Sequence, residues 1–206
     1  MTQSAPKPAK APKSLSEERV ITAARKLFME RGFSAVSGDL LCREARVSKT
    51  SLYKYFGDMN GVLQAVLVEE GDLYQLDINT EPENEAAFWD TLIGYGTNLL
   101  KLLNEPFCLN MDRTFHEEAR ANPELVRLFY DNAYGRGHRD IAALLEHGKA
   151  QNFFHTDLPA TDLADNLISM WEGLRYIRAR LGLTDKPFED PEKWAAQCVG
   201  TLLRRR

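Results

Sequence analysis

The chain has 206 residues, of which 44% are hydrophobic and 27% charged, a composition typical of a globular protein with one or two domains. It contains no run of about 18 apolar residues and no apolar leader near its start, so we expect a cytoplasmic protein without a membrane span. Its three cysteines lie far apart without CxxC spacing, which argues against a disulfide framework or a zinc site and favours buried thiols; they are Cys42, Cys108 and Cys198.

The net charge of −4 is unevenly distributed along the chain. Residues 1–61 hold eleven Lys or Arg against six Asp or Glu, a net charge of +5, and the remainder carries −9. This division is expected when one end of a protein meets a polyanion, although ordinary surface composition can also produce it. Residues 1–13 are rich in Pro, Ala and Lys with almost nothing to bury, and predict a disordered basic arm; its lysines are Lys7, Lys10 and Lys13.

Three helices are predicted after the arm. The first covers residues 16–31, with Ser16 as its N-cap. The second covers residues 37–45, and the third covers residues 49–56 after the N-cap Ser48. Because the second and third are short and joined by a tight turn, they predict a helix-turn-helix.

The rest of the chain continues the helical pattern. Asp58 is expected to cap the next helix, and the one that starts at Pro123 is expected to kink at Gly135 and Gly137. The helices are predicted at residues 58–76, 85–103, 106–120, 123–149, 161–181 and 190–203. No β alternation appears, so the fold class is all-α, with an N-terminal domain at residues 14–61 and a larger helical domain at residues 62–206.

The predicted helix at residues 49–56 is amphipathic. With Leu52 and Phe56 facing the core, its other side presents hydroxyl, phenol and ammonium groups; they belong to Thr50, Ser51, Tyr53, Lys54 and Tyr55. Such groups hydrogen-bond phosphates and base edges in a DNA major groove. A merely solvated face is the alternative, but the basic arm and the capped turn before this helix favour DNA.

One set of residues in the segment 16–63 has the spacing of a known family: Arg31-Gly32-Phe33, Leu41, Ala45, Val47-Ser48, Lys49, Leu52-Tyr53, Tyr55-Phe56, Asp58 and Leu63. The segment resembles the N-terminal domain of the TetR family of transcriptional regulators. The resemblance implies a three-helix DNA-binding domain and a C-terminal ligand-binding and dimerisation domain. It also implies a homodimer that binds a pseudo-palindromic operator in double-stranded DNA, most often as a repressor, and is released by a small-molecule effector. The aromatic residues in the middle of the chain indicate that this effector is small and apolar or aromatic. The candidate DNA-binding residues are Ser37, Arg46, Ser48, Lys49, Thr50, Ser51, Tyr53, Lys54 and Tyr55.

Four positions depart from the family pattern. Cys42 replaces the usual alanine, a small change at a buried position. Val36 stands where a threonine is usual, and Met59 where a lysine is usual; both bear on phosphate contacts. Arg46 replaces the glycine of the turn. We expect DNA binding to persist, with Arg46 or the lysines of residues 1–13 supplying the phosphate contacts instead.

The resemblance also assigns the two most apolar C-terminal helices to a four-helix dimer interface. Its candidate residues are Leu167, Trp171, Leu174, Trp194, Val199 and Leu202, unless these faces pack within one chain. Aromatic residues crowd the middle of the chain, and some are expected to line an effector pocket rather than fill the core. The candidates are Phe88, Tyr95, Phe115, Phe129, Tyr130 and Trp171.

No catalytic motif, cofactor-binding motif or metal-ligand spacing occurs, so we expect neither an enzyme nor a cofactor or metal site. Two other functions remain open. One is a helical small-molecule-binding protein, or an enzyme, whose helix-turn-helix is vestigial. The other is an effector-independent DNA-binding regulator whose C-terminal domain only dimerises.

Overall fold

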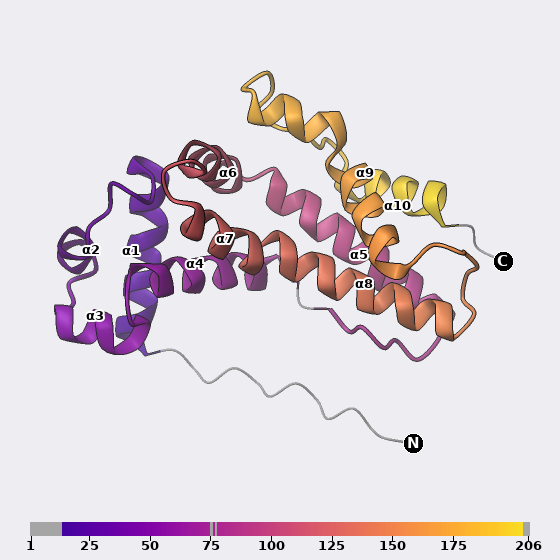
Figure 1. The fold of residues 1–206 in the computed structure, drawn as a ribbon, viewed down its shortest axis with the longest axis horizontal. Helices are drawn as coiled ribbons and strands as arrows, with labels where there is room; N and C mark the ends of the chain where they lie inside the picture. The colour runs from indigo at the N-terminus through magenta and orange to yellow at the C-terminus, as the bar shows by residue number, and fades with distance from the viewer. Residues whose placement is uncertain (1–13, 75, 77, 204–206) are drawn as a thin grey trace. The chain divides into compact units, whose positions relative to one another are not determined.

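The computed structural model describes residues 14–74, 76 and 78–203. Within them the chain forms ten α-helices and no strand (Figure 1), which confirms the all-α class. The helices are α1 Leu15–Arg31, α2 Gly38–Ala45, α3 Lys49–Phe56, α4 Met59–Leu73, α5 Glu85–Leu103, α6 Pro106–Glu118, α7 Pro123–Asn132, α8 Tyr134–Ala150, α9 Ala160–Arg180 and α10 Pro191–Leu202. Among the described residues, no helix is long and apolar enough to cross a membrane. The predicted basic arm, residues 1–13, lies outside this part of the chain.

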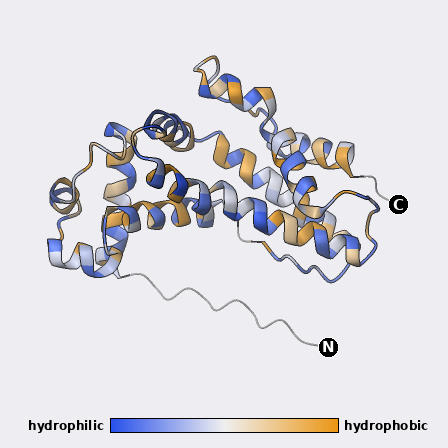
Figure 2. Cartoon of the chain, viewed as in Figure 1, coloured by the Kyte–Doolittle hydropathy of each residue, from blue (hydrophilic) through white to orange (hydrophobic). Residues whose placement is uncertain are grey.

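The chain divides into two compact units, one ending at Val62 and the other beginning at Leu63. In the first unit, α1 packs against α2 and α3 through its apolar stripe, which the sequence predicted. The buried residues of that stripe include Val20, Ala24, Leu27 and Phe28. Figure 2 shows hydrophobic residues concentrated along α4 and α5, whereas α3 is mostly hydrophilic or neutral.

The start of α1 differs from the prediction. Ser14, not Ser16, is the N-cap: its hydroxyl accepts a hydrogen bond from the Glu17 amide at 3.3 Å, and its own amide donates to Glu17 Oε2 at 2.7 Å. This reciprocal pair satisfies two backbone donors at once, which a cap at Ser16 would not do because no Glu or Gln stands three residues further on.

The second unit is built around α5, which packs most extensively against α10, and around the pair formed by α8 and α9. Fully buried side chains from all four helices form its core; they include Phe88, Leu92, Leu144, Leu167, Trp171 and Ala195. A Cβ atom on Gly96 would lie 2.5 Å from the Trp171 indole ring. The absence of a side chain at Gly96 therefore allows α5 to approach α9 closely.

The break between α7 and α8 lies at Ala133 (φ −103°, ψ −86°), so the expected kink at Gly135 and Gly137 is wrong. Both glycines lie inside α8. A Cβ atom on Gly137 would lie 2.5 Å from the hydroxyl oxygen of Tyr95. This glycine therefore serves the packing of α8 against α5 rather than a bend in the backbone.

A second break interrupts α9. Gly173 has φ 49° and ψ −161°, outside the helical region. The residues after Gly173 are therefore out of register with the buried face of the first part of α9. Leu174 and Ile177 are 65% and 46% exposed, whereas Trp171 is completely buried. The predicted single apolar stripe through residues 161–181 is therefore wrong beyond Gly173.

Candidate functional site

The turn between α2 and α3 is held by backbone and side-chain hydrogen bonds. Arg46 adopts the left-handed conformation (φ 55°, ψ 48°), and the Val47 amide donates to the Cys42 carbonyl at 3.0 Å. Ser48 then caps α3, since its hydroxyl accepts from the Ser51 amide at 3.1 Å. The structure therefore has the predicted helix-turn-helix, with the predicted cap at Ser48 and α3 at the predicted residues 49–56.

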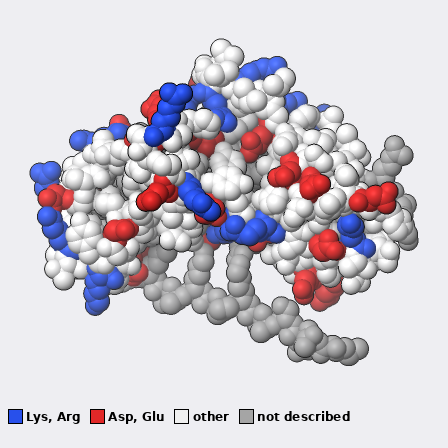
Figure 3. Space-filling view, viewed as in Figure 1, with Lys and Arg blue, Asp and Glu red and all other residues white. Residues whose placement is uncertain are grey.

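The outer side of α3 is polar and accessible. Leu52 is completely buried and anchors the helix, while Thr50 and Lys54 are exposed. Tyr53 and Tyr55 are 43% and 40% exposed. The α3 segment thus presents hydroxyl, phenol and ammonium groups together, and Figure 3 shows basic side chains along the outer edge of the first unit. These are the groups that contact phosphates and base edges in protein–DNA complexes.

Tyr53 also packs against the first turn of α2. A Cβ atom on Gly38 would lie 2.7 Å from the Tyr53 hydroxyl oxygen, so the glycine provides the room that the phenol occupies. The neighbouring Ser37 caps α2 by accepting a hydrogen bond from the Leu40 amide at 3.2 Å. Two of the predicted DNA-binding residues, Ser37 and Tyr53, thereby lie at the α2 N-terminus, where backbone N–H groups favour a phosphate.

Lys49 is the first residue of α3, and its ammonium group lies 2.6 Å from Asp39 Oδ1. The hydrogen bond and the charge of Asp39 raise the pKa of Lys49 above its usual value, so the lysine is cationic. Both side chains are more than half exposed, and an exposed pair of this kind contributes little to stability. A DNA phosphate can therefore replace Asp39 as the partner of Lys49 at low cost.

The departures from the family pattern have distinct structural positions. Val36 is buried, with 6% of its surface exposed, and adds to the core of the first unit. Met59 is half-buried at the first position of α4, and Asp58 caps this helix by accepting from the Gly61 amide at 2.8 Å, as predicted. Cys42 is buried, and burial raises the pKa of its thiol.

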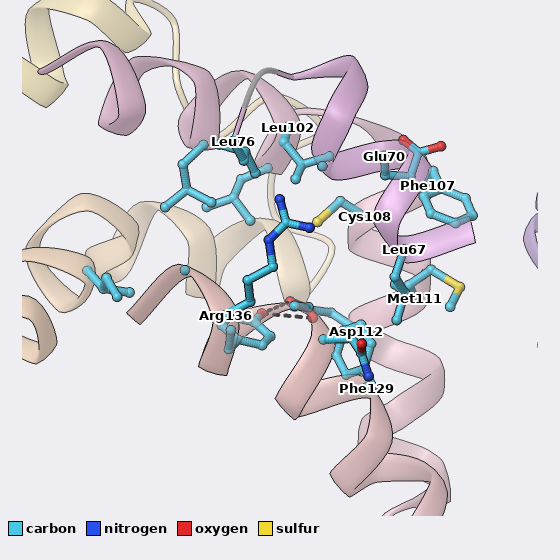
Figure 4. A pocket seen from close by; sticks show the side chains of 18 of the residues that line it. Leu67, Glu70, Leu76, Leu102, Phe107, Cys108, Met111, Asp112, Phe129 and Arg136 are labelled. Atoms are coloured by element: carbon cyan, nitrogen blue, oxygen red, sulfur yellow. Dashed lines mark hydrogen bonds between the residues drawn. The ribbon is translucent and has the colours of Figure 1, made fainter. Parts of the chain in front are cut away.

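The second unit contains a hollow whose lining residues are mostly apolar, a character that suits a small molecule (Figure 4). Six helices, α4 to α9, line it. Of the predicted effector residues, Tyr95 and Phe129 line this hollow. Phe115 and Tyr130 line a second hollow, and Phe129 contributes to both.

The structure does not bring the other two predicted effector residues to either hollow. Phe88 is completely buried and stacks on Phe154 with ring centroids 5.6 Å apart. Trp171 is completely buried against α5, with its ring centroid 6.2 Å from that of Tyr95. Phe88 and Trp171 therefore fill the core, which was the alternative to lining a pocket. Both rings are covered because α5 lies close to α8 and α9.

A buried carboxylate lies in the wall of the first hollow. Asp112 is 1% exposed and accepts hydrogen bonds at 2.8 Å from the hydroxyls of Tyr134 and Tyr176, which lie on α8 and α9. Burial and the charge of Asp112 raise the pKa of Glu172, on α9, to about 7. Burial, together with nearby acidic groups, also raises the pKa of the Tyr134 phenol.

The sequence analysis missed these polar residues of the hollow; they are Glu70, Asp112, Arg136 and Glu172. One signal was available for Asp112. It stands four residues after Cys108 and three before Phe115, so helical periodicity places it on the apolar face of α6. A carboxylate on such a face needs buried partners.

Three of the predicted dimer residues are covered by their own chain. Leu167 and Trp171 are completely buried and Val199 is 2% exposed, so they have no surface left for a partner. Trp194 is half-buried: its indole N–H donates to the Trp171 carbonyl at 2.9 Å. Leu202 is also half-buried. Large exposed apolar side chains lie instead at the end of α9 and just after it; they are Leu174, Ile177, Leu181 and Leu183.

The all-α fold with a capped helix-turn-helix defines a class of DNA-binding regulators, and comparison with known proteins specifies the family. The profile of the bacterial regulatory proteins of the tetR family matches residues 20–66, and that of the AefR-like transcriptional repressor C-terminal domain matches residues 90–205. The chain therefore belongs to the TetR family of transcriptional regulators, with a C-terminal domain of the AefR-like type.

Individual relatives agree with this assignment. The transcriptional regulator HbdR of Aromatoleum sp. (strain CIB) is 38% identical over 74 residues, which are 35% of this chain and 32% of HbdR. The flavonoid-responsive regulator FrrA has a similar structure, with a TM-score of 0.70, 28% identity, and coverage of 91% of this chain and 94% of that one. A TetR regulator from Agrobacterium tumefaciens has a TM-score of 0.73 and 24% identity over 92% of this chain and 93% of that one.

Proposed function

We propose that the protein is a homodimeric repressor that binds a pseudo-palindromic operator and is released by a small apolar or aromatic effector. The observation that carries DNA binding is α3, whose buried Leu52 leaves a polar side of hydroxyl, phenol and ammonium groups accessible. In a dimer, two such helices about 34–36 Å apart enter successive major grooves. The chain's family membership supports the same function.

The roles on DNA follow from the chemistry of each side chain. Thr50 and Lys54 are exposed in the middle of α3 and are proposed to reach base edges. Three residues at the edge of this surface are proposed to contact phosphates. Lys49 is the first residue of α3, the Tyr53 hydroxyl lies beside the first residue of α2, and Arg46 lies in the turn between the two helices. The hydroxyls of Ser37 and Ser48 already cap α2 and α3. At these two helix starts, the free backbone N–H groups are therefore proposed to donate to phosphates.

The test of DNA binding is a double variant, Lys49→Ala with Lys54→Ala. Each phosphate contact contributes a slope of about −0.9 to log K against log salt, so we expect the affinity for a DNA site selected from a random pool to fall about tenfold or more and the slope to become shallower. The control is Lys186→Ala with Lys193→Ala, which removes two exposed lysines from the second unit. A folded α3 variant that binds as tightly as the parent protein overturns the proposal and favours a vestigial helix-turn-helix.

The effector is proposed to bind in the first hollow, which α4 to α9 line. Most of its lining is apolar, which suits an apolar or aromatic body, and FrrA, 28% identical, is a flavonoid-responsive regulator. Three residues of α4 line the hollow, namely Leu67, Glu70 and Gly71, and the same helix begins at Met59, directly after the helix-turn-helix. We propose that an effector shifts α4 and thereby changes the spacing of the two recognition helices, which lowers DNA affinity.

A further inference from the structure

The two hollows of the second unit share one wall. Four residues line both of them: Asp112 on α6, Phe129 on α7, Tyr134 on α8 and Glu172 on α9. This shared wall therefore combines two carboxyl groups with two aromatic rings, contributed by four different helices. On the proposed function, which this inference rests on, the shared wall belongs to the effector site.

The aromatic rings of the shared wall are held at a steep angle. The ring centroids of Phe129 and Tyr134 lie 5.9 Å apart with an interplanar angle of 82°. Phe115 stacks on Phe129 at 4.0 Å, and Tyr130 stacks on Tyr134 at 6.3 Å, so each ring is supported by a second one. Rings in such an arrangement present π faces in two directions, which is the geometry that aromatic cages use for ammonium groups.

The charges of the first hollow have one predominant sign. Its lining has three carboxyl groups, those of Glu70, Asp112 and Glu172, against the single guanidinium group of Arg136, and Figure 4 shows Arg136 directed into the hollow. Asp140 lies 3.9 Å from that guanidinium and offsets its charge. An anionic ligand would be repelled here, whereas a cation would be attracted, and the attraction between the opposite charges is stronger than in water because the surroundings are apolar.

The buried position of Glu172 affects the titration of its carboxyl group. Burial first, and then the charge of Asp112, raise the pKa of its carboxyl group to about 7, so a proton is held there more tightly than in water. The other titratable or charged groups that line the two hollows or interact with Glu172 are Glu70 on α4; Tyr95 on α5; Cys108, Asp112 and His116 on α6; Tyr130 on α7; Tyr134 and Arg136 on α8; and Arg180 on α9.

We propose that the shared wall binds the ammonium group of a lipophilic cation, whose apolar body lies in the first hollow. The ammonium group is placed against the carboxyl groups of Asp112 and Glu172 and the faces of Phe129 and Tyr134. The apolar body is placed against the leucine side chains of α5 that line the hollow, which are Leu99, Leu102 and Leu103. The effector class is thus an aromatic or aliphatic amine, not a carboxylic acid.

The test compares two probes of equal shape by calorimetric titration of the full-length protein. One is phenylbutyltrimethylammonium, and the other is the neutral hydrocarbon in which a carbon atom replaces its nitrogen. At about pH 8 the cation is expected to bind about tenfold more tightly than the hydrocarbon. Because Glu172 takes up a proton as the pH falls through about 7, this preference is expected to decrease severalfold at about pH 6.

Two variants test whether the preference for the cation over the hydrocarbon depends on Glu172. Glu172→Gln keeps the size of the side chain but not the charge, so it is expected to remove most of the preference for the cation and to leave hydrocarbon binding unchanged. Glu146→Gln, which removes an exposed carboxyl group of α8, is the matched control and is expected to change neither. Unaltered helical circular dichroism verifies that both variants fold.

Three results overturn the inference: equal or tighter binding of the hydrocarbon, no binding of the cation, or a preference that survives in Glu172→Gln. Since the titration contains no DNA, its outcome is independent of DNA binding. A hydrocarbon that binds and releases the selected DNA, while the cation does neither, would support the proposed function and contradict only the assignment of charge. If the protein binds the cation more tightly but binds no DNA, the assignment of charge is supported and the proposed function is contradicted.

Discussion

At the scale of single residues, Arg46 occupies a position whose left-handed backbone conformation favours glycine. It has φ 55° in the turn of the helix-turn-helix, where the family usually has a glycine, and the left-handed conformation costs a non-glycine residue about 1–2 kcal/mol. The side chain is exposed, so no burial offsets this cost. An arginine at a strained position beside the recognition helix is explained if its guanidinium group contacts a DNA phosphate.

We therefore expect Arg46→Gly to raise the free energy of unfolding by about 1 kcal/mol while weakening DNA binding. Urea denaturation measures the first effect, and titration of the selected DNA site at several salt concentrations measures the second. Arg46→Ala is the control, since it removes the guanidinium group but retains the Cβ that is strained at this φ. A glycine variant that is no more stable than the alanine variant contradicts the account of strain.

At the scale of elements, the break in α9 determines which side chains reach the surface. Gly173 has a positive φ, and a Cβ built on it meets no atom within 4 Å. Space is thus not the reason for the glycine; its backbone conformation is. A continuous helix would leave Leu174 in register with the buried Trp171, whereas the break leaves it 65% exposed.

Gly173→Ala is accordingly expected to lower the free energy of unfolding by about 1–3 kcal/mol, because this backbone region is nearly restricted to glycine. Gly94→Ala is the matched control: Gly94 lies within α5, also with open space around it, and alanine there is expected to stabilise by about 0.5–1 kcal/mol. Thermal or urea unfolding followed by circular dichroism measures both. Equal stabilisation by the two substitutions would mean that α9 is able to run straight through position 173.

At the scale of the whole molecule, the exposed apolar side chains at the end of α9 and just after it mark the surface proposed for dimerisation. Leu174, Leu181 and Leu183 are 65%, 70% and 72% exposed, and water contact with so much apolar area is unfavourable. A second copy of the chain covers this surface in the proposed dimer. Symmetry would bring the same patch of each copy together, as in other two-fold interfaces.

Leu174→Asp is expected to convert the dimer into a monomer and to weaken operator binding with it, because a charge would have to be buried at the centre of the interface. Analytical ultracentrifugation measures the mass, and DNA titration the affinity. Leu158→Asp introduces the same charge at another exposed leucine and is expected to leave the dimer intact. Unchanged mass for the Leu174 variant would place the interface elsewhere.

Much of the fold could be predicted because the signals are local. The cap at Ser48 and the apolar positions of α1 and α3 depend on residues within about two turns, and the bounds of α3 and α5 agree with the prediction. Predictions failed where two nearby residues were both suited to the same place, such as a helix cap or a helix break. Ser16 is a good N-cap by itself, but Ser14 forms the reciprocal pair with Glu17. Ala133 rather than a glycine breaks the helix, and Gly137 is explained instead by the close approach of Tyr95.

The amino-acid sequence by itself determined the helical class, the helix-turn-helix and the resemblance to the TetR family, because helical periodicity, caps and a short ungapped motif all act over a few residues. Only the tertiary structure decided which aromatic rings line a hollow and which fill the core, as Phe129 and Phe88 show. It also brought Asp112 and Glu172, on different helices, into one wall. Burial and proximity between distant segments depend on how whole helices pack, and no local pattern encodes them.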